Sequence, residues 1–317
     1  MQLLLLHLDD ALELQPDFMR SCLMAGAHEI HASDEGPAIR LWSRPQAFEA
    51  FAGRLTRQMP RVRRDARLCF IGSGDFHHAT SLLLETALQD EEKPVTIIHF
   101  DNHPDWVRFA DGMHCGSWVN RAAQNAQVDK VITVGACSND LERPEWKGAN
   151  LSLLSTGALE LYPYDHAPSR VRKDYGSGSC YVQASGCIEW KTIASFGEDN
   201  FIAHLLSRIK TKNVYLTVDK DVFVRDDAVT NWDQGSMRLP YLLSMIAAIG
   251  DTHRIIGADV IGDYSRPVYA GSPWTVLTKR AEVLFDQPLG SPDPTSAMRI
   301  NSEGNHKLLT ALSQVMQ

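Results

Sequence analysis

Acidic and imidazole side chains alternate directly after one apolar run of the chain. The segment 98–105 reads IHFDNHPD, so Asp101, His103 and Asp105 stand two residues apart. Side chains of a strand alternate between its faces, and these three can therefore converge where the strand becomes a loop. Carboxylate and imidazole groups that converge in this way favour a divalent metal ion. The alternative is a turn rich in Asp, Asn and Pro that caps the next helix.

A second pair of acids follows a second apolar run. Residues 213–218 lead into Asp219 and Asp221, again two positions apart. Neighbouring carboxylates raise each other's pKa, and a bound cation removes that cost. The pair therefore strengthens the prediction of a metal site.

A third apolar run, 67–71, leads into the glycine-rich turn GSGDFHH at 72–78, which adds His77 and His78. Open α/β sheets assemble their sites at the carboxyl ends of parallel strands. The three strand ends supply enough Asp and His for two metal ions that share bridging carboxylates.

These motifs resemble those of the arginase/agmatinase (ureohydrolase) family. Residues 101–105 resemble its Asp-Ala-His-x-Asp motif, and residues 217–221 resemble its Ser-x-Asp-x-Asp motif. Residues 72–77 are similar to a modified Gly-Gly-Asp-His, and 114–116 stand near the family's His-Gly. The resemblance covers about 68–267. It implies a three-layer αβα sandwich around a mostly parallel sheet, two Mn²⁺ ions per chain, and hydrolysis of a guanidino or related C–N bond.

The resemblance also implies a ligand set for the two ions, in which Asp101 and Asp219 bridge both of them. The expected metal ligands are His77, Asp101, His103, Asp105, Asp219 and Asp221. The family's histidine directly follows its aspartate, where this chain has Phe76. We therefore expect His77 to be the ligand, and His78 is the alternative.

Two further residues receive catalytic roles through the resemblance. His114 is expected to shuttle a proton to the leaving amine, because an imidazole titrates near neutral pH. Without the family it reads equally well as a surface histidine. Asp221 is expected to orient the attacking hydroxide.

The chain departs from the family pattern near its C-terminus. The family's strand there carries a Glu that pairs with the substrate's guanidinium, and Gly262 occupies that position. Asp263 follows one residue later with a shorter side chain. Either a bulge carries Asp263 into place, since a glycine in a strand often marks one, or the substrate is held differently. We predict that Asp263 contacts the substrate cation, which a small molecule or a peptide-borne arginine could supply. Trp106 and Trp118 are expected to shape a wider or more apolar mouth.

Two other functions compete with this interpretation. A zinc deacetylase on the related arginase–deacetylase fold would use one Zn²⁺ and a His-His pair, which His77 and His78 superficially resemble. A non-catalytic metal-binding protein on the same scaffold is the second rival, although such a protein would be expected to lose ligands.

The elements that must position these residues alternate along the chain. Apolar strand-like runs occur at 3–8, 67–72, 95–100, 130–136, 213–218 and 254–261. Helical patterns occur at 47–58, 79–87, 118–126, 201–209, 240–249 and 303–315. This alternation predicts a parallel sheet covered on both faces within one domain, 1–317. Residues 150–192 are irregular and are expected near the mouth of the site, and 287–294 is expected to be a second loop.

The bulk composition is that of a globular protein. The chain has 317 residues, 44% of them hydrophobic, and a formal charge of −8. It lacks the basic stripe and motifs of a nucleic-acid binder, and 61–64 is a short basic run that we interpret as a solvated loop. No apolar run is long enough to span a membrane, and the first ten residues lack a basic signal-peptide region. Cys69 and Cys137 lie in apolar strands, as reduced thiols do, so we expect a cytoplasmic protein. A homo-oligomer is a further hypothesis.

Overall fold

The computed structural model describes residues 1–60, 65–89, 91–288 and 292–316. The basic run 61–64 lies outside the described residues, and so does the centre of the loop expected at 287–294.

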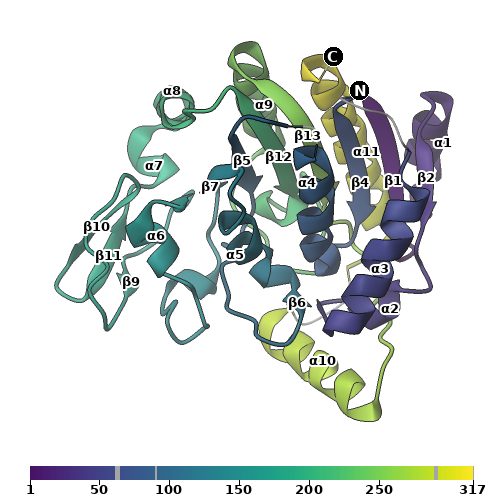
Figure 1. Cartoon of the computed structure of the whole chain (residues 1–317), viewed down its shortest axis with the longest axis horizontal. Helices are drawn as coiled ribbons and strands as arrows, with labels where there is room; N and C mark the ends of the chain where they lie inside the picture. The colour runs from purple at the N-terminus through teal and green to yellow at the C-terminus, as the bar shows by residue number, and fades with distance from the viewer. Residues whose placement is uncertain (61–64, 90, 289–291, 317) are drawn as a thin grey trace.

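A parallel sheet of eight strands forms the centre of the molecule (Figure 1). Its strand order is β2–β1–β4–β13–β12–β5–β7–β8, and every neighbouring pair is parallel. The strands are β1 (Gln2–His7), β2 (His28–His31), β4 (Arg67–Gly72), β5 (Val95–Phe100), β7 (Val128–Val134), β8 (Leu159–Tyr162), β12 (Asn213–Asp219) and β13 (Arg254–Ile261). The predicted α/β architecture with a parallel central sheet is confirmed.

The central strands are buried along their whole length. All six residues of β5 and all seven of β12 are buried. Strands that are covered on both faces read as continuous apolar runs, which is why the sequence revealed them.

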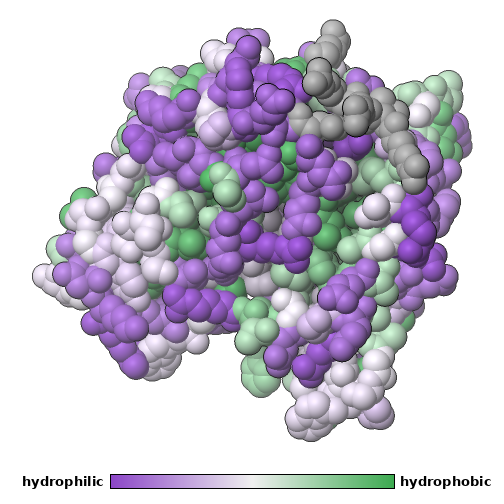
Figure 2. Space-filling view, viewed as in Figure 1, coloured by the Kyte–Doolittle hydropathy of each residue, from purple (hydrophilic) through white to green (hydrophobic). Residues whose placement is uncertain are grey.

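Helices cover both faces of this sheet. In Figure 1, α3, α4 and α5 lie in front of it, and α9 and α11 lie behind it. The helices are α1 (Pro16–Met24), α2 (Gly36–Ile39), α3 (Pro45–Gln58), α4 (Thr80–Leu88), α5 (Trp118–Ala123), α6 (Ser152–Thr156), α7 (Ile193–Phe196), α8 (Glu198–Arg208), α9 (Leu239–Thr252), α10 (Pro273–Asp286) and α11 (Pro294–Val315). Short 3-10 turns are η1 (Gly74–Ala79), η2 (Cys115–Ser117), η3 (Asn139–Leu141) and η4 (Lys220–Val222). Figure 2 shows mainly hydrophilic residues over this face, because amphipathic helices turn their apolar side to the sheet.

Two small antiparallel sheets complete the structure. One contains β9 (Ser169–Arg170), β10 (Tyr181–Ala184) and β11 (Cys187–Trp190). It lies beyond α6 at the left of Figure 1. The other pairs β3 (Trp42–Ser43) with β6 (Met113–His114), and Trp42 stands opposite His114 in its register.

Several elements were not expected from the sequence, among them β2, β8 and α10. The strands β2 and β8 are short edges of the sheet, and in β2 only Ile30 is fully buried. Helix α10 projects from the body of the molecule (Figure 1), and Lys279 is its one buried residue. Its exposed apolar residues disguise the 3.6-residue pattern by which a covered helix is recognised.

The described residues include no helix with the length and apolar character needed to cross a membrane. All six cysteines are free thiols, of which Cys69 is buried and Cys137 is partly buried.

Candidate active site

The sheet brings the predicted motifs to one place. The strands β4, β13, β12 and β5 are consecutive in the sheet. Their carboxyl ends lead into the turns that carry the candidate ligands.

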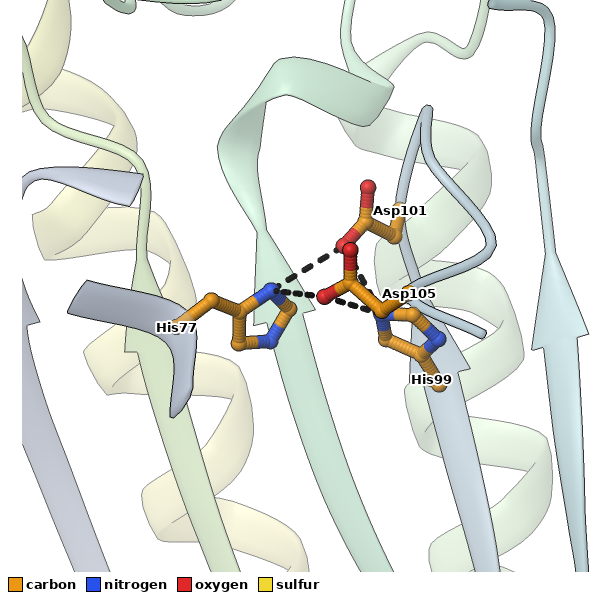
Figure 3. A group of neighbouring side chains, drawn as sticks. All are labelled: His77, His99, Asp101 and Asp105. Atoms are coloured by element: carbon orange, nitrogen blue, oxygen red, sulfur yellow. Dashed lines mark hydrogen bonds and ion pairs between the residues drawn. The ribbon is translucent and has the colours of Figure 1, made fainter. Parts of the chain in front are cut away.

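Four buried side chains form a first group that could hold a metal ion (Figure 3). His77 Nδ1 lies 3.1 Å from Asp101 Oδ2 and 3.0 Å from Asp105 Oδ2. His99 Nε2 lies 2.7 Å from the same Asp101 oxygen. The group therefore combines two strand ends, β4 through η1 and β5.

A second group consists of Asp101, His103 and Asp221. His103 Nδ1 lies 2.9 Å from Asp221 Oδ2 and 3.6 Å from Asp101 Oδ1. Asp101 thus belongs to both groups, which is the position that a bridging ligand requires. Asp219 lies beside them, with its Oδ2 3.5 Å from His77 Nδ1. The structure brings all six expected ligands together.

The two neighbouring histidines of η1 have different surroundings. His77 Nε2 lies 3.0 Å from the Thr217 hydroxyl, which donates a hydrogen bond to Asp259. These two hydrogen bonds place a proton on Nε2 of His77, so its Nδ1 is the atom that could ligate a metal ion. His78 packs against Phe48 and its ring nitrogens have no hydrogen-bond partner among the described residues. Burial lowers the pKa of His78 to about 3, so its imidazole is neutral. Neither of the two candidate metal groups found among the described residues includes His78.

His99 was not predicted as a site residue. It stands two positions before Asp101 on the same strand face, and this spacing could have revealed it. Its Nδ1 lies 3.0 Å from the Thr133 hydroxyl, and its Nε2 contacts Asp101. His99 therefore holds the carboxylate that both groups share.

The charges of the cluster fit divalent cations. Burial, followed by the charge of Asp101, raises the pKa of Asp219 to about 7. Burial and the charge of Asp219 raise the pKa of Asp221 well above its ordinary value. Burial favours the neutral form of His77, but hydrogen bonds to Asp101 and Asp105 prevail and raise its pKa. Cations would relieve this excess of buried negative charge, and oxygen and imidazole donors without a thiolate suit Mn²⁺.

All six expected ligands line a cavity of about 440 Å³. Lys147 is the only lysine or arginine among the described residues that line it. Its acidic lining residues are Asp101, Asp105, Asp140, Asp219, Asp221, Asp233, Glu282 and Asp286. Four of them belong to the expected ligand set, and the other four leave the cavity wall negative.

His114 lines the same cavity and is held by two partners. Its Nδ1 accepts a hydrogen bond of 2.8 Å from the backbone amide of Gly116, so the proton of the neutral ring is on Nε2. This nitrogen lies 2.7 Å from Oε1 of Glu282 on α10. Sequence reasoning missed Glu282, because a helix remote from the strand-end motifs carries it.

Asp263 does not reach the cavity. Its carboxylate forms a buried ion pair with Lys220 and accepts a hydrogen bond of 3.1 Å from Asn305. Gly262 has a φ of +100°, and a Cβ there would lie 2.3 Å from Oδ1 of Asp219. The structure therefore does not support the substrate contact expected of Asp263, and it has no room for a larger side chain at position 262.

The two tryptophans expected at the mouth also lie elsewhere. Trp106 is 1% exposed and Trp118 is fully buried. The Trp118 indole donates a hydrogen bond of 2.6 Å to Asp105 Oδ2, so this residue holds a candidate ligand instead of shaping the entrance.

Asp233 was not predicted either. Its Oδ1 lies 2.9 Å from His103 Nε2, and its backbone carbonyl accepts a hydrogen bond of 2.9 Å from Asn102. Since His103 also contacts Asp221, Asp233 fixes the orientation of a candidate ligand. None of the described lining residues comes from 150–192, so the excursion expected at the mouth lies away from it.

Residues 20–183, just over half of the chain, match the family model described as "Arginase family". The chain belongs to the arginase family. An uncharacterised protein of Thermotoga maritima is 25% identical to this arginase-family chain over 194 residues. That alignment covers 61% of this chain and 57% of the relative, so the chain spans little more than half of the relative's length.

Solved structures show the same fold for this family member. An arginase of Entamoeba histolytica in complex with L-ornithine is 11% identical, with 99% of both chains covered and a TM-score of 0.58. An arginase of Bacillus subtilis is 12% identical, with 98% of this chain and 97% of that chain covered and a TM-score of 0.57. Formimidoylglutamase of Bacillus subtilis is 14% identical, with 98% and 87% covered and a TM-score of 0.53. Identities this low establish the fold alone.

Proposed function

We propose that the protein is a binuclear manganese hydrolase that cleaves a C–N bond of a guanidino, amidino or formimino substrate. The observation that carries this proposal is the pair of candidate metal groups that share Asp101, a residue lining an acidic cavity. Membership of the arginase family and the likeness to arginases and formimidoylglutamase support it.

Two metal ions would supply a water that is deprotonated near neutral pH. His77 and Asp105 would hold one ion, and His103 and Asp221 the other, with Asp101 and Asp219 shared between them. Asp221 would also orient the attacking oxygen. The negative wall favours a cationic substrate, either a small molecule or an arginine side chain of a peptide.

The alternative of a zinc deacetylase with a His-His pair is less well supported. Such a pair requires His77 and His78 to face the same reacting group. His78 instead packs against Phe48, apart from the cluster. The second group with Asp221 would also have no role in a site for one ion.

The metal assignment is tested by the manganese content of the purified protein after loading and dialysis. Wild-type protein should retain two ions per chain, and Asp101→Ala should lose both because this residue touches both groups. The control is Asp17→Ala, since the Asp17 side chain is 80% exposed on α1. Full metal content in Asp101→Ala would refute the shared-ligand assignment.

The reaction is tested by a screen for urea, amine and acetate release. The substrates are guanidino, amidino, formimino and acetylated compounds, including peptides that contain arginine. Urea or ammonia from a C–N substrate supports the proposal. Acetate from an acetylated amine would assign the protein to the deacetylases, and no product from any substrate would favour a binding protein.

The role of His114 is tested by His114→Asn. We expect turnover to fall by about 10²-fold or more, the usual scale of acid–base assistance, with the metal content unchanged. Turnover equal to that of the wild type would mean that His114 only lines the wall.

A further inference from the structure

We propose that Glu282 of α10 binds the cationic group of the substrate and selects substrates that carry one. The inference rests on the proposed function, because it names the class of molecule that the same cavity accepts. It assigns a specificity role to a residue on a projecting helix instead of a strand end.

Each of the four acidic wall residues outside the expected ligand set has one ion-pair partner among the described residues, and the partner of Glu282 is His114. Asp233 pairs with His103, while Asp140 and Asp286 share Lys147 at 3.6 Å and 2.8 Å. In the described part of the chain, no lysine or arginine forms an ion pair with Glu282. Its partners are His114 and the indole of Trp42, which donates to Oε2 at 3.0 Å.

The carboxylate of Glu282 retains capacity for a ligand. An ionised carboxylate offers about four acceptor positions, and His114 and Trp42 occupy two of them. The side chain is 22% exposed and lines the cavity, so its remaining lone pairs are accessible from the cavity. Lys279 lies close enough to sense the charge of Glu282, but its ammonium donates to the Ala38 carbonyl. A partly desolvated carboxylate without a Lys or Arg ion pair in the described part of the chain gains from binding a cation.

The position of Glu282 is fixed by its neighbours. Lys279 lies one turn earlier on α10, donates a hydrogen bond of 2.9 Å to the Ala38 carbonyl, and packs its ammonium 4.8 Å from the centre of the Trp42 ring. Trp42 in turn contacts Glu282 and pairs with His114 across β3 and β6. These contacts hold the Glu282 side chain at the wall of the cavity before a substrate binds.

This arrangement places the substrate's cation beside His114. A guanidinium or ammonium group on Glu282 would lie next to the nitrogen of His114 that carries its proton. The expected metal ligands line the same cavity. Binding to Glu282 would thus hold the substrate beside His114 within the cavity that these ligands line, which gives the interaction a role in positioning as well as selection.

The test measures binding by calorimetry to manganese-loaded protein, with guanidinium and methylguanidinium as cationic probes and urea as the neutral isostere. Glu282→Gln should weaken both cations by about tenfold to hundredfold, since a charge-assisted contact is lost. Affinity for urea should stay within about threefold. The two donors use different carboxylate oxygens, so the single amide oxygen of the glutamine can keep the hydrogen bond from only one of Trp42 and His114. An unchanged melting temperature and metal content would verify an intact site.

The matched control is Asp286→Asn, which removes one negative charge from the same helix and the same cavity. Its carboxylate is already paired with Lys147, so the loss for the cations should be much smaller. Equal losses of cation affinity in both variants would mean that the summed negative charge of the cavity attracts the cation, and would overturn a direct contact with Glu282. An unchanged affinity in Glu282→Gln would overturn it as well, and Glu282→Ala serves as the second variant if the glutamine protein does not fold.

The outcomes separate this inference from the proposed function. Cation binding that depends on Glu282, without hydrolysis of any C–N substrate, would uphold the inference and reject the hydrolase. Hydrolysis of a guanidino substrate with a Michaelis constant that is insensitive to Glu282→Gln would uphold the hydrolase and reject the inference.

Discussion

Gly262 shows how one residue can leave room for a candidate metal ligand without being a ligand itself. It directly follows β13, which lies in the sheet between β4, the strand before His77, and β12, the strand that ends at Asp219. Its φ of +100° is open mainly to glycine, and the space where a Cβ would stand holds Asp219 Oδ1 and the backbone nitrogen of Lys220. The same turn directs Asp263 to Lys220, away from the cavity.

We predict that Gly262→Ala displaces Asp219 and lowers both manganese content and stability. A Cβ at 2.3 Å from a carboxylate oxygen and 2.6 Å from a backbone nitrogen forces one of them to move. The measurements are metal stoichiometry and the melting temperature with and without Mn²⁺. The control is Gly157→Ala, where φ is +75° and nothing lies within 4 Å. It should cost about 1 kcal/mol from backbone strain and leave the metal in place; equal metal loss in the two variants would contradict the prediction.

At the scale of the element, the edge strand β8 depends on charge as well as on apolar packing. Glu160 of β8 forms ion pairs with Lys130 of β7 at 2.8 Å and with Arg208 of α8 at 2.7 Å. The Tyr162 hydroxyl donates a further hydrogen bond to Glu160. These contacts join the last strand of the sheet to its neighbour and to the helix beside it.

We predict a stability loss of about 2 kcal/mol at pH 7 for Glu160→Gln, because the variant leaves two cations without their partner. Burial raises the pKa of Glu160, but hydrogen bonds from Arg208 and Lys130 outweigh it and lower the pKa to about 2, against an ordinary value of 4.5. Between about pH 2 and 4.5, Glu160 binds a proton more readily in the unfolded chain than in the folded one. The contribution of Glu160 is therefore complete above about pH 4.5 and is lost as the pH falls through about 2.

Urea unfolding at pH 7, 4.5 and 3 measures this contribution. The gap between wild type and Glu160→Gln should narrow as the pH falls. The exposed Glu189 on β11 provides the control variant Glu189→Gln, for which we expect no gap. A gap of the same size at all three pH values would assign the loss to packing instead of charge.

Neither helix α10 nor the position of its Glu282 beside His114 could be predicted from sequence patterns. Its apolar residues Trp274, Leu277, Leu284 and Phe285 are all more than half exposed. Its functional contact, Glu282 with His114, joins residues 168 positions apart. Such a contact depends on tertiary packing, and no local spacing predicts it.

At the scale of the molecule, the sequence predicted the strands with continuous apolar runs and the acids that alternate at their ends. The apolar runs of β5 and β12 marked the central strands, and their terminal acids marked Asp101 and Asp219. The short, partly polar edges β2 and β8 carry too little of that pattern. The direction of Asp263 depended on the backbone at Gly262, which residue types alone do not fix.

Metal binding at the candidate site should stabilise the folded state of the whole molecule. The expected ligands lie at the ends of three strands of one sheet, His77 after β4 and the acids after β5 and β12, so ions bound there would hold these strands together. A ligand at 100 times its dissociation constant stabilises the folded state by about 2.7 kcal/mol. For a chain of this size we predict that Mn²⁺ raises the melting temperature by about 5 °C or more, as measured by calorimetry against a sample treated with chelator.

This stabilisation should grow with pH. Burial and the charge of Asp101 raise the pKa of Asp219 to about 7 in the folded protein without metal. Between about pH 4 and 7 the unfolded chain releases a proton that the folded chain keeps, so the stability of the metal-free protein falls as the pH rises. The pKa of His77 is also raised, and a protonated imidazole cannot ligate a metal. The difference in melting temperature with and without Mn²⁺ should therefore be small at pH 5 and largest above pH 7. It should vanish at every pH in Asp101→Ala and persist in Asp17→Ala, and an increment that is independent of pH would mean that the ion binds outside the buried cluster.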